Sequence, residues 1–232
     1  MSEQTNIRKL VEQELALCAG NHEYAIKKYF MVEHPIQGKI PFNLYPFQSK
    51  TLQELLRHKY NIILKSRQMG ISTLVASHAL VNMLFKDNFK VLVIATTQEV
   101  AKNLVHKVKV MYSNLPSWLK VPAEDNNKLQ LTLRNGSSIK AISSSPTAGR
   151  SEALSLLIID EAAFIDSIDE IWTSAQMTLA TGGDAILLST PNGVDNLFHQ
   201  LWTDAEMGNS PEGMTAFNPI KLKWDLHPDR DQ

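Results

Sequence analysis

A short polar segment between two apolar ones holds the residues best suited to bind phosphate. Residues 62–64 form a short apolar run after Asn61, and the segment Leu74–Phe85 repeats apolar residues at helical spacing. The loop between them consists of Lys65, Ser66, Arg67, Gln68, Met69, Gly70, Ile71, Ser72 and Thr73. A strand, a loop and a helix in this order predict a phosphate-binding P-loop, because a helix N-terminus presents free N–H groups and a positive dipole end to phosphate oxygens.

The loop departs from the usual pattern of such loops, G-x-x-x-x-G-K-[ST]. Gly70 and Ser72 match the pattern, so the backbone can approach the phosphates and a hydroxyl can bind Mg²⁺. Lys65, however, stands at the first glycine, and Ile71 stands at the lysine. The missing ammonium could come from Lys65 or from Arg67. A buried strand followed by an ordinary turn remains an alternative.

A second candidate site is the pair Asp160-Glu161, which follows the apolar run 154–159. A carboxylate at the tip of a strand would hold Mg²⁺ beside Ser72, as in phosphoryl-transfer enzymes. Glu161 would act as general base on the attacking water. The alternative is an acidic start for the next helix, and the P-loop-like segment upstream favours the catalytic interpretation.

Three further elements have side chains suited to nucleotide chemistry. Ser189 and Thr190 end another apolar run, where their hydroxyls could contact water or the γ-phosphate, and a plain turn is the alternative. Arginine often stabilises charge on a transferred phosphoryl group. Arg67 could do so within the loop, and Arg150 could do so in cis or towards a neighbouring subunit; each could instead be structural. Gln48, at a helix start ahead of the loop, could read one edge of adenine or simply be solvated.

Composition limits the class of protein. A chain of 232 residues with 44% hydrophobic and 20% charged residues is typical of a soluble globular protein with one large α/β domain or two small ones. The net charge of −1 gives no overall basic signature for nucleic acid. The single cysteine, Cys18, excludes an intramolecular disulfide and suits a reducing cytosol. No apolar run is long enough to span a bilayer, and the first residues lack a signal sequence, so we expect no membrane association.

The remaining pattern predicts strands that alternate with helices. Helices are expected over 5–18, 23–30, 47–59, 96–114 with Thr96 in a capping box, 167–180 and around 197–202; strands are expected over 90–95, 154–159 and 185–190. A hairpin is expected over 129–142 around Asn135-Gly136. We expect an extended linker over 34–46 and loops over 207–232. The alternation predicts a mostly parallel α/β sheet with functional sites at the carboxyl ends of its strands.

Taken together, three segments resemble the ATPase motifs of the large terminase subunit of tailed bacteriophages, the DNA-packaging motors. They are residues 64–74, 156–165 and 189–193. The order of the surrounding elements is similar too, from the glutamine element to Trp224-Asp-Leu-His-Pro near the end, and the resemblance covers residues 42–230. It implies a P-loop NTPase (RecA/ASCE-like) α/β fold with a mostly parallel sheet flanked by helices and a small N-terminal helical extension.

The resemblance also assigns roles to the candidate residues. Residues 65–73 correspond to a deviant Walker A loop, and some family members carry the lysine early, as Lys65 does here. Asp160 and Glu161 correspond to the Walker B pair, and residues 189–191 to the coupling motif. Arg67 and Arg150 match positions proposed in the family as arginine fingers that act in cis and in trans, respectively.

The expected organisation follows from the same resemblance. Residues 1–40 would be a helical extension or lid, 41–210 the P-loop ATPase core, and 211–232 a linker towards a nuclease domain that this chain lacks, so no nuclease activity is expected. The expected function is hydrolysis of ATP with Mg²⁺ to move double-stranded DNA into a procapsid in the host cell cytoplasm. The expected partners are the portal protein, the small terminase subunit and further copies in a ring, with the isolated domain monomeric. A helicase-like nucleic-acid-dependent ATPase and a catalytically dead nucleotide-binding module remain alternatives.

Overall fold

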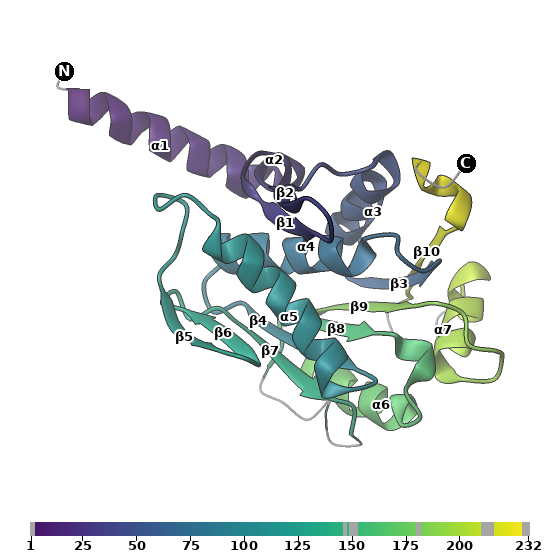
Figure 1. The fold of residues 1–232 in the computed structure, drawn as a ribbon. Coiled ribbons are helices and arrows are strands. Elements are labelled where there is room, and N and C mark those ends of the chain that lie inside the picture. The colour runs from purple at the N-terminus through teal and green to yellow at the C-terminus, as the bar shows by residue number, and fades with distance from the viewer. Residues whose placement is uncertain (1–2, 146–147, 149–152, 180–181, 210–215, 229–232) are drawn as a thin grey trace.

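An eight-stranded sheet in the order β10-β3-β9-β8-β4-β7-β6-β5 forms the centre of the fold (Figure 1). The structure is a computed structural model, and it describes residues 3–145, 148, 153–179, 182–209 and 216–228. The helices are α1 (Glu3–Gly20), α2 (His22–Tyr29), α3 (Pro46–Arg57), α4 (Ile71–Phe85), α5 (Gln98–Ser113), α6 (Ile168–Leu179) and α7 (Leu197–Glu206). The strands are β1 (Met31–His34), β2 (Gly38–Pro41), β3 (Tyr60–Lys65), β4 (Lys90–Ala95), β5 (Ala123–Asn127), β6 (Gln130–Leu133), β7 (Ser138–Ser143), β8 (Leu156–Asp160), β9 (Asp184–Ser189) and β10 (Asn218–Leu222). The 3₁₀ helices are η1 (Ala162–Phe164) and η2 (Trp224–Leu226).

The sheet is parallel from β10 to β7 and becomes antiparallel over β7, β6 and β5. The carboxyl ends of β3, β9, β8 and β4 therefore lie along one edge. Strand β9 separates β3, which leads into the predicted P-loop, from β8, which ends in Asp160. A mostly parallel sheet with the two motif strands ending at the same edge is what the predicted P-loop NTPase fold class requires, and this fold class is confirmed.

Helices cover both faces of the sheet, which explains why the central strands are apolar throughout. All residues of β8 are buried, as are all of β9 after Asp184, because a parallel strand is covered on both sides. Helices α3, α4 and α5 pack on one face, and α6 and α7 pack on the other (Figure 1). Helix α4 is buried over nearly its whole length, because α2, α3 and α5 contact its outer side.

The N-terminal extension is helical, as predicted, and α1 projects away from the body of the domain (Figure 1). The linker predicted over 34–46 was wrong in its first half, because β1 and β2 form an antiparallel hairpin there. Its turn is closed by His34, whose Nδ1 accepts hydrogen bonds from the N–H groups of Ile36 and Gln37. Gly38 ends the turn with a φ of 71°, a conformation that favours glycine.

Two other expectations also need correction. The segment 207–232, expected to be loops, supplies β10, which pairs in parallel with β3 at the edge of the sheet. The N-cap of α5 is Thr97 rather than Thr96, since the Thr97 side chain accepts a hydrogen bond from the Val100 N–H. The Asn135-Gly136 hairpin is confirmed by the antiparallel pairing of β6 with β7. No helix within the described ranges is both long and apolar enough to cross a membrane.

Candidate functional site

The loop between β3 and α4 has a conformation that requires glycine at one position. Gly70 is the N-cap of α4, with a φ of 67°. A Cβ atom at this position would lie 2.6 Å from Nε2 of Gln48. Both the left-handed backbone and the close neighbour therefore disfavour a residue with a Cβ at this position. The first turn of α4 begins directly after this glycine, so its unpaired N–H groups face the loop.

The Gln48 side chain, in α3, forms a hydrogen bond to this loop. Its side chain is only 2% exposed. Its Nε2 donates to the backbone oxygen of Met69 at 3.0 Å, and its Oε1 accepts from the N–H of Tyr45 at 3.0 Å. The amide thus links the start of one helix to the loop before another. Recognition of adenine by Gln48 stays a prediction.

Asp160, the last residue of β8, faces the first turn of α4. Its Oδ2 accepts from the Ser72 hydroxyl at 2.9 Å, and its Oδ1 accepts from the Glu161 N–H at 2.9 Å. The side chain is 5% exposed, and burial raises the pKa of Asp160, although the charge of Lys65 and the Ser72 hydrogen bond oppose this shift. A carboxylate whose charge is so poorly compensated, beside a hydroxyl, suits a cation. Mg²⁺ binds typically through one or two protein oxygens together with water and phosphate oxygens, so this donor set fits Mg²⁺.

Lys65 and Glu161 form an ion pair across the mouth of the site. Lys65 ends β3 and is 8% exposed, and its Nζ donates to Oε1 of Glu161 at 2.9 Å. The other carboxylate oxygen, Oε2, lies 3.4 Å from both the N–H and the hydroxyl of Thr190, at the end of β9. The neighbouring Ser189 is fully buried, and its Oγ accepts from the Ala163 N–H at 3.1 Å. Three adjacent strands therefore position one cluster.

The predicted loop residues divide into distinct environments. Met69 and Ile71 are buried, so they pack the loop against the core. The Ser66 N–H donates to the backbone oxygen of Leu222 in β10, while Arg67 and Gln68 are exposed. Arg150 lies outside the described residues.

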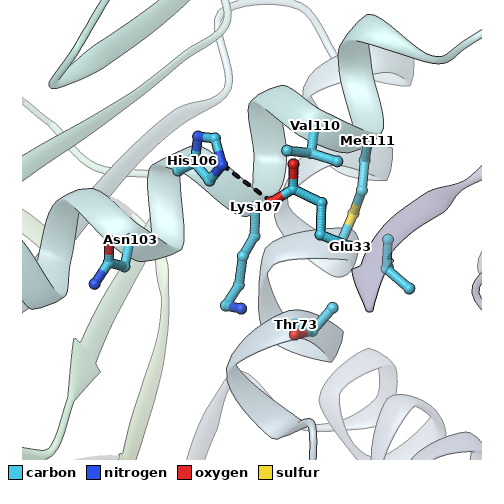
Figure 2. A pocket seen from close by; sticks show the side chains of 8 residues that line it. Glu33, Thr73, Asn103, His106, Lys107, Val110 and Met111 are labelled. Atoms are coloured by element: carbon cyan, nitrogen blue, oxygen red, sulfur yellow. Dashed lines mark hydrogen bonds and ion pairs between the residues drawn. The ribbon is translucent and has the colours of Figure 1, made fainter. Parts of the chain in front are cut away.

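Thr73 points to a different hollow, which sequence reasoning did not find. A pocket of about 340 Å³ lies between α4, α5 and β1, and Thr73, Asn103 and Lys107 line it (Figure 2). At its rim, His106 Nε2 lies 3.2 Å from Oε2 of Glu33. The pocket thus lies beside both the N-terminal hairpin and α4.

Sequence reasoning also missed an aromatic cluster beside Gln48. The rings of Tyr45 and Phe47 are nearly parallel, with centroids 5.8 Å apart, and the His227 ring lies 4.8 Å from that of Tyr45. The cluster brings the end of the described chain to the start of α3. The aromatic residues around Pro46 were a signal for it, but nothing in the sequence indicated that His227 would join them.

Comparison with known protein families shows the family of the chain. Residues 62–225 match the family described as terminase large subunit, T4likevirus-type, N-terminal. The match spans more than half of the chain, from the P-loop strand past β10. The chain belongs to the terminase large subunit family.

Two relatives share a shorter segment with the chain. The FluMu protein gp28 of a Mu-like prophage of Haemophilus influenzae is 42% identical over 74 residues, which are 32% of this chain and 14% of that protein. The probable terminase large subunit gp28 of Escherichia phage Mu is 40% identical over 74 residues, or 32% of this chain and 13% of its own length. The matched segment is thus a small part of each of these relatives.

Solved terminase structures share the fold. The large terminase of bacteriophage HK97 has a TM-score of 0.65 at 19% identity, and the match covers 92% of this chain and 45% of that one. The large terminase ATPase domain of Thermus phage P74-26 has a TM-score of 0.60 at 21% identity, covering 82% and 85%. A large terminase of a thermophilic bacteriophage, solved in complex with ADP, has a TM-score of 0.60 at 14% identity, covering 77% and 45%.

Proposed function

We propose that this terminase ATPase domain hydrolyses ATP and that, in an assembled motor, hydrolysis drives double-stranded DNA into a procapsid. The observation that carries the proposal is the cluster at the carboxyl edge of the sheet. Lys65, Ser72 and Asp160 lie there together with Glu161, in front of the N-terminus of α4. A cation, a hydroxyl–carboxylate pair and a second carboxylate are the parts that phosphoryl transfer to water requires.

The loop would bind the phosphates of ATP. The first-turn N–H groups of α4 and the positive end of its dipole favour negative charge, and Lys65 adds an ammonium from the end of β3. Because the Lys65 ammonium now contacts Glu161, bound phosphate would compete for it and free the carboxylate. Ser72 and Asp160 would hold Mg²⁺, which when bound neutralises charge on the phosphate oxygens.

Glu161 would take the proton. Its carboxylate would accept a proton from water as the water oxygen bonds to the γ-phosphorus, while the bond from that phosphorus to the bridging oxygen of ADP breaks. The products are ADP and inorganic phosphate. Thr190 contacts the same carboxylate and would sense its position, as expected of a coupling residue. Arg67, or Arg150 from the same or a neighbouring subunit, would stabilise the charge of the transition state.

The biological setting is part of the proposal. The proposed partners are double-stranded DNA, the portal protein, the small terminase subunit and further copies in a ring, in the host cytoplasm. The proposed organisation is an N-terminal extension over 1–40, which holds α1, α2 and most of the β1–β2 hairpin, a core over 41–210, and a C-terminal segment over 211–232 that supplies β10 to the core sheet. Since the net charge is −1, the isolated domain should bind duplex DNA weakly, because phosphate binding needs clustered Lys and Arg. A tight, salt-sensitive complex of the monomer with a duplex would contradict this expectation.

Hydrolysis of ATP, measured against protein concentration with and without Mg²⁺, tests the proposal. Lys65→Ala and Glu161→Ala should both abolish it, and Lys140→Ala, on the exposed side of β7, should leave it unchanged. A rate that rises faster than linearly with concentration would indicate an arginine supplied by a neighbour. Hydrolysis that persists in Glu161→Ala would refute the assigned base. Separation of the strands of a duplex would instead support the helicase alternative.

A further inference from the structure

Glu161 has a backbone conformation that needs support. Its φ of 53° lies in the left-handed region, which residues other than glycine rarely adopt. Such strain persists where the surrounding structure fixes the backbone, and it is often found at functional sites. The residue is followed directly by η1, in which the Phe164 N–H donates to the Glu161 backbone oxygen at 3.0 Å. Whatever holds η1 therefore also holds the direction of the Glu161 side chain.

Both backbone polar groups of Ala163, the middle residue of η1, bind side chains at the end of β9 and just after it. The Ala163 N–H donates to Ser189 Oγ at 3.1 Å. The Ala163 backbone oxygen accepts from Nδ2 of Asn192 at 2.9 Å. Ala163 is 6% exposed, so its backbone needs these partners. The side chains of Ser189 and Asn192 thus stabilise η1 through hydrogen bonds to its backbone.

Asn192 also connects the turn to α7. Its backbone oxygen accepts from Nδ2 of Asn196 at 3.0 Å. Asn196 is the N-cap of α7, and its Oδ1 accepts from the His199 N–H at 3.0 Å. The Asn192 side chain itself is exposed, so packing alone does not require an asparagine here. A continuous series of hydrogen bonds runs from η1 through Asn192 to the start of a helix.

We propose that Asn192 is a positioning residue that fixes the general base Glu161 through the backbone oxygen of Ala163 and links its position to α7. The inference rests on the proposed function, since it assumes that Glu161 is the base. Without the Asn192 amide, the Ala163 oxygen loses its partner and η1 can relax, so the Glu161 carboxylate leaves its place. Nucleotide binding should be preserved, because the hydrogen bonds of Asn192 in the described part of the chain go to Ala163 and Asn196, outside the loop.

The test compares Asn192→Ala and Asn192→Asp with the control Val194→Ala, a 67% exposed residue of the same loop. Both Asn192 variants should lower kcat by about 10-fold to 100-fold, with KM changed by less than about twofold. The aspartate should be at least as damaging, because a carboxylate cannot donate to the Ala163 oxygen. Amide hydrogen exchange over residues 161–165 should become about fivefold faster in both variants, and the melting temperature should fall by no more than about 2–4 °C, the loss expected from one unpaired buried acceptor. Val194→Ala should match the wild type in every measurement.

The two readouts separate the inference from the proposed function. If the wild-type chain hydrolyses ATP and the Asn192 variants match its kcat and its exchange, the positioning role is wrong. A loss of kcat accompanied by weaker nucleotide binding and a melting temperature lower by clearly more than about 4 °C would mean a general structural role and would also overturn it. If the wild type binds ATP without hydrolysing it, the proposed function fails, and the positioning role of Asn192 is then judged from amide hydrogen exchange alone. Faster exchange confined to residues 161–165 in the Asn192 variants supports that role, and exchange equal to that of the wild type refutes it.

Discussion

Lys65 Nζ and Glu161 Oε1 lie 2.9 Å apart, so the cation expected to bind phosphate holds the carboxylate expected to activate water. The two residues end β3 and follow β8, with β9 between these strands. In this arrangement Lys65 and Glu161 neutralise each other until an anion such as phosphate competes with Glu161 for the Lys65 ammonium. Loss of the Lys65 ammonium should therefore have two effects: the site loses a ligand for phosphate, and Glu161 loses its ion-pair partner.

Replacement of Lys65 by alanine should therefore reduce ATP hydrolysis by about 10²-fold or more, the cost typical of removing one electrostatic contact to a transition state. Lys65→Arg should retain part of the activity, because the charge is kept but the bulkier guanidinium must fit a site that is 8% exposed. Steady-state kinetics would show this, with Lys140→Ala as the control. Full activity in Lys65→Ala would transfer the role of the cation to Arg67.

Asp160→Asn should stabilise the protein in the absence of nucleotide. Burial raises the pKa of Asp160 above its value in the unfolded chain, so the ionised form lowers the free energy of unfolding at neutral pH, and this cost is removed as the pH falls through the folded pKa. An asparagine can keep hydrogen bonds to Ser72 and to the Glu161 N–H without the charge. We expect a gain of about 1 kcal/mol, or about 2–4 °C in melting temperature.

The same variant should lose the stabilisation that Mg²⁺ and ATP give the wild type, because its cation ligand is gone. Thermal unfolding with and without Mg²⁺–ATP measures both effects. Asp87→Asn, an exposed position after α4, is the matched control and should change neither. An unliganded Asp160→Asn protein that melts below the wild type would contradict the argument from burial.

Gly70→Ala should damage the loop more than a glycine replacement elsewhere. The new Cβ would lie 2.6 Å from Gln48 Nε2, and the alanine backbone would have to keep a φ of 67°. We therefore expect the free energy of unfolding to fall by about 1–3 kcal/mol and ATP to bind more weakly. Gly20→Ala is the control, because nothing lies within 4 Å of a Cβ there. Adding Gln48→Ala should recover the stability lost to the close contact but not the stability lost to the strained φ. A double-mutant cycle measures the two contributions. No recovery at all would show that the contact costs little.

Acid should destabilise the packing of α2 against α4. The rings of His22 and His78 lie 5.5 Å apart between these helices, and the Nδ1 atom of each is buried without a hydrogen-bond partner. Burial lowers the pKa of His22 to about 4 and that of His78 to about 3, and Lys86 contributes to both shifts. Because the unfolded chain binds these protons first, stability should fall as the pH decreases from the ordinary histidine value of 6.5 towards 4.

Melting temperatures between pH 5 and pH 8 would measure this dependence. In His78→Gln the slope should be shallower, although the protein is less stable at neutral pH because of altered packing. Gln200→Ala, an exposed change on α7 that removes no titrating group, should keep the wild-type slope. Equal slopes in wild type and His78→Gln would refute the role of the buried pair.

The central motifs were predictable because each carries a strong local signal. The apolar strands before Lys65 and Asp160 have the continuous hydrophobicity of buried parallel strands, and Asn135-Gly136 has the residues that a tight hairpin requires. The position of the motifs at one edge then follows from the rule that parallel strands end together. These signals depend on the sequence alone.

Other features depend on contacts that the sequence does not encode locally. Strand β10 contains Pro219, which normally argues against a strand, and the edge of the sheet is where proline is tolerated. Hairpin β1–β2 has four-residue strands with little alternation, and His34 stabilises its turn through the ring. The burial of Gln48 and its hydrogen bond to Met69 arise from tertiary packing. The local sequence therefore cannot distinguish this buried glutamine from a solvated one at the start of a helix.

The most direct test of the account is ATP hydrolysis by Glu161→Gln, with nucleotide binding measured on the same protein. The amide preserves the shape of the side chain but cannot accept a proton from water. We expect affinity for Mg²⁺–ATP close to that of the wild type and a hydrolysis rate lower by about 10²-fold to 10⁴-fold, with Glu170→Gln on α6 unchanged. A Glu161→Gln protein that hydrolyses ATP at the wild-type rate would contradict the assignment of Glu161 as the base and, with it, the mechanism built on this site.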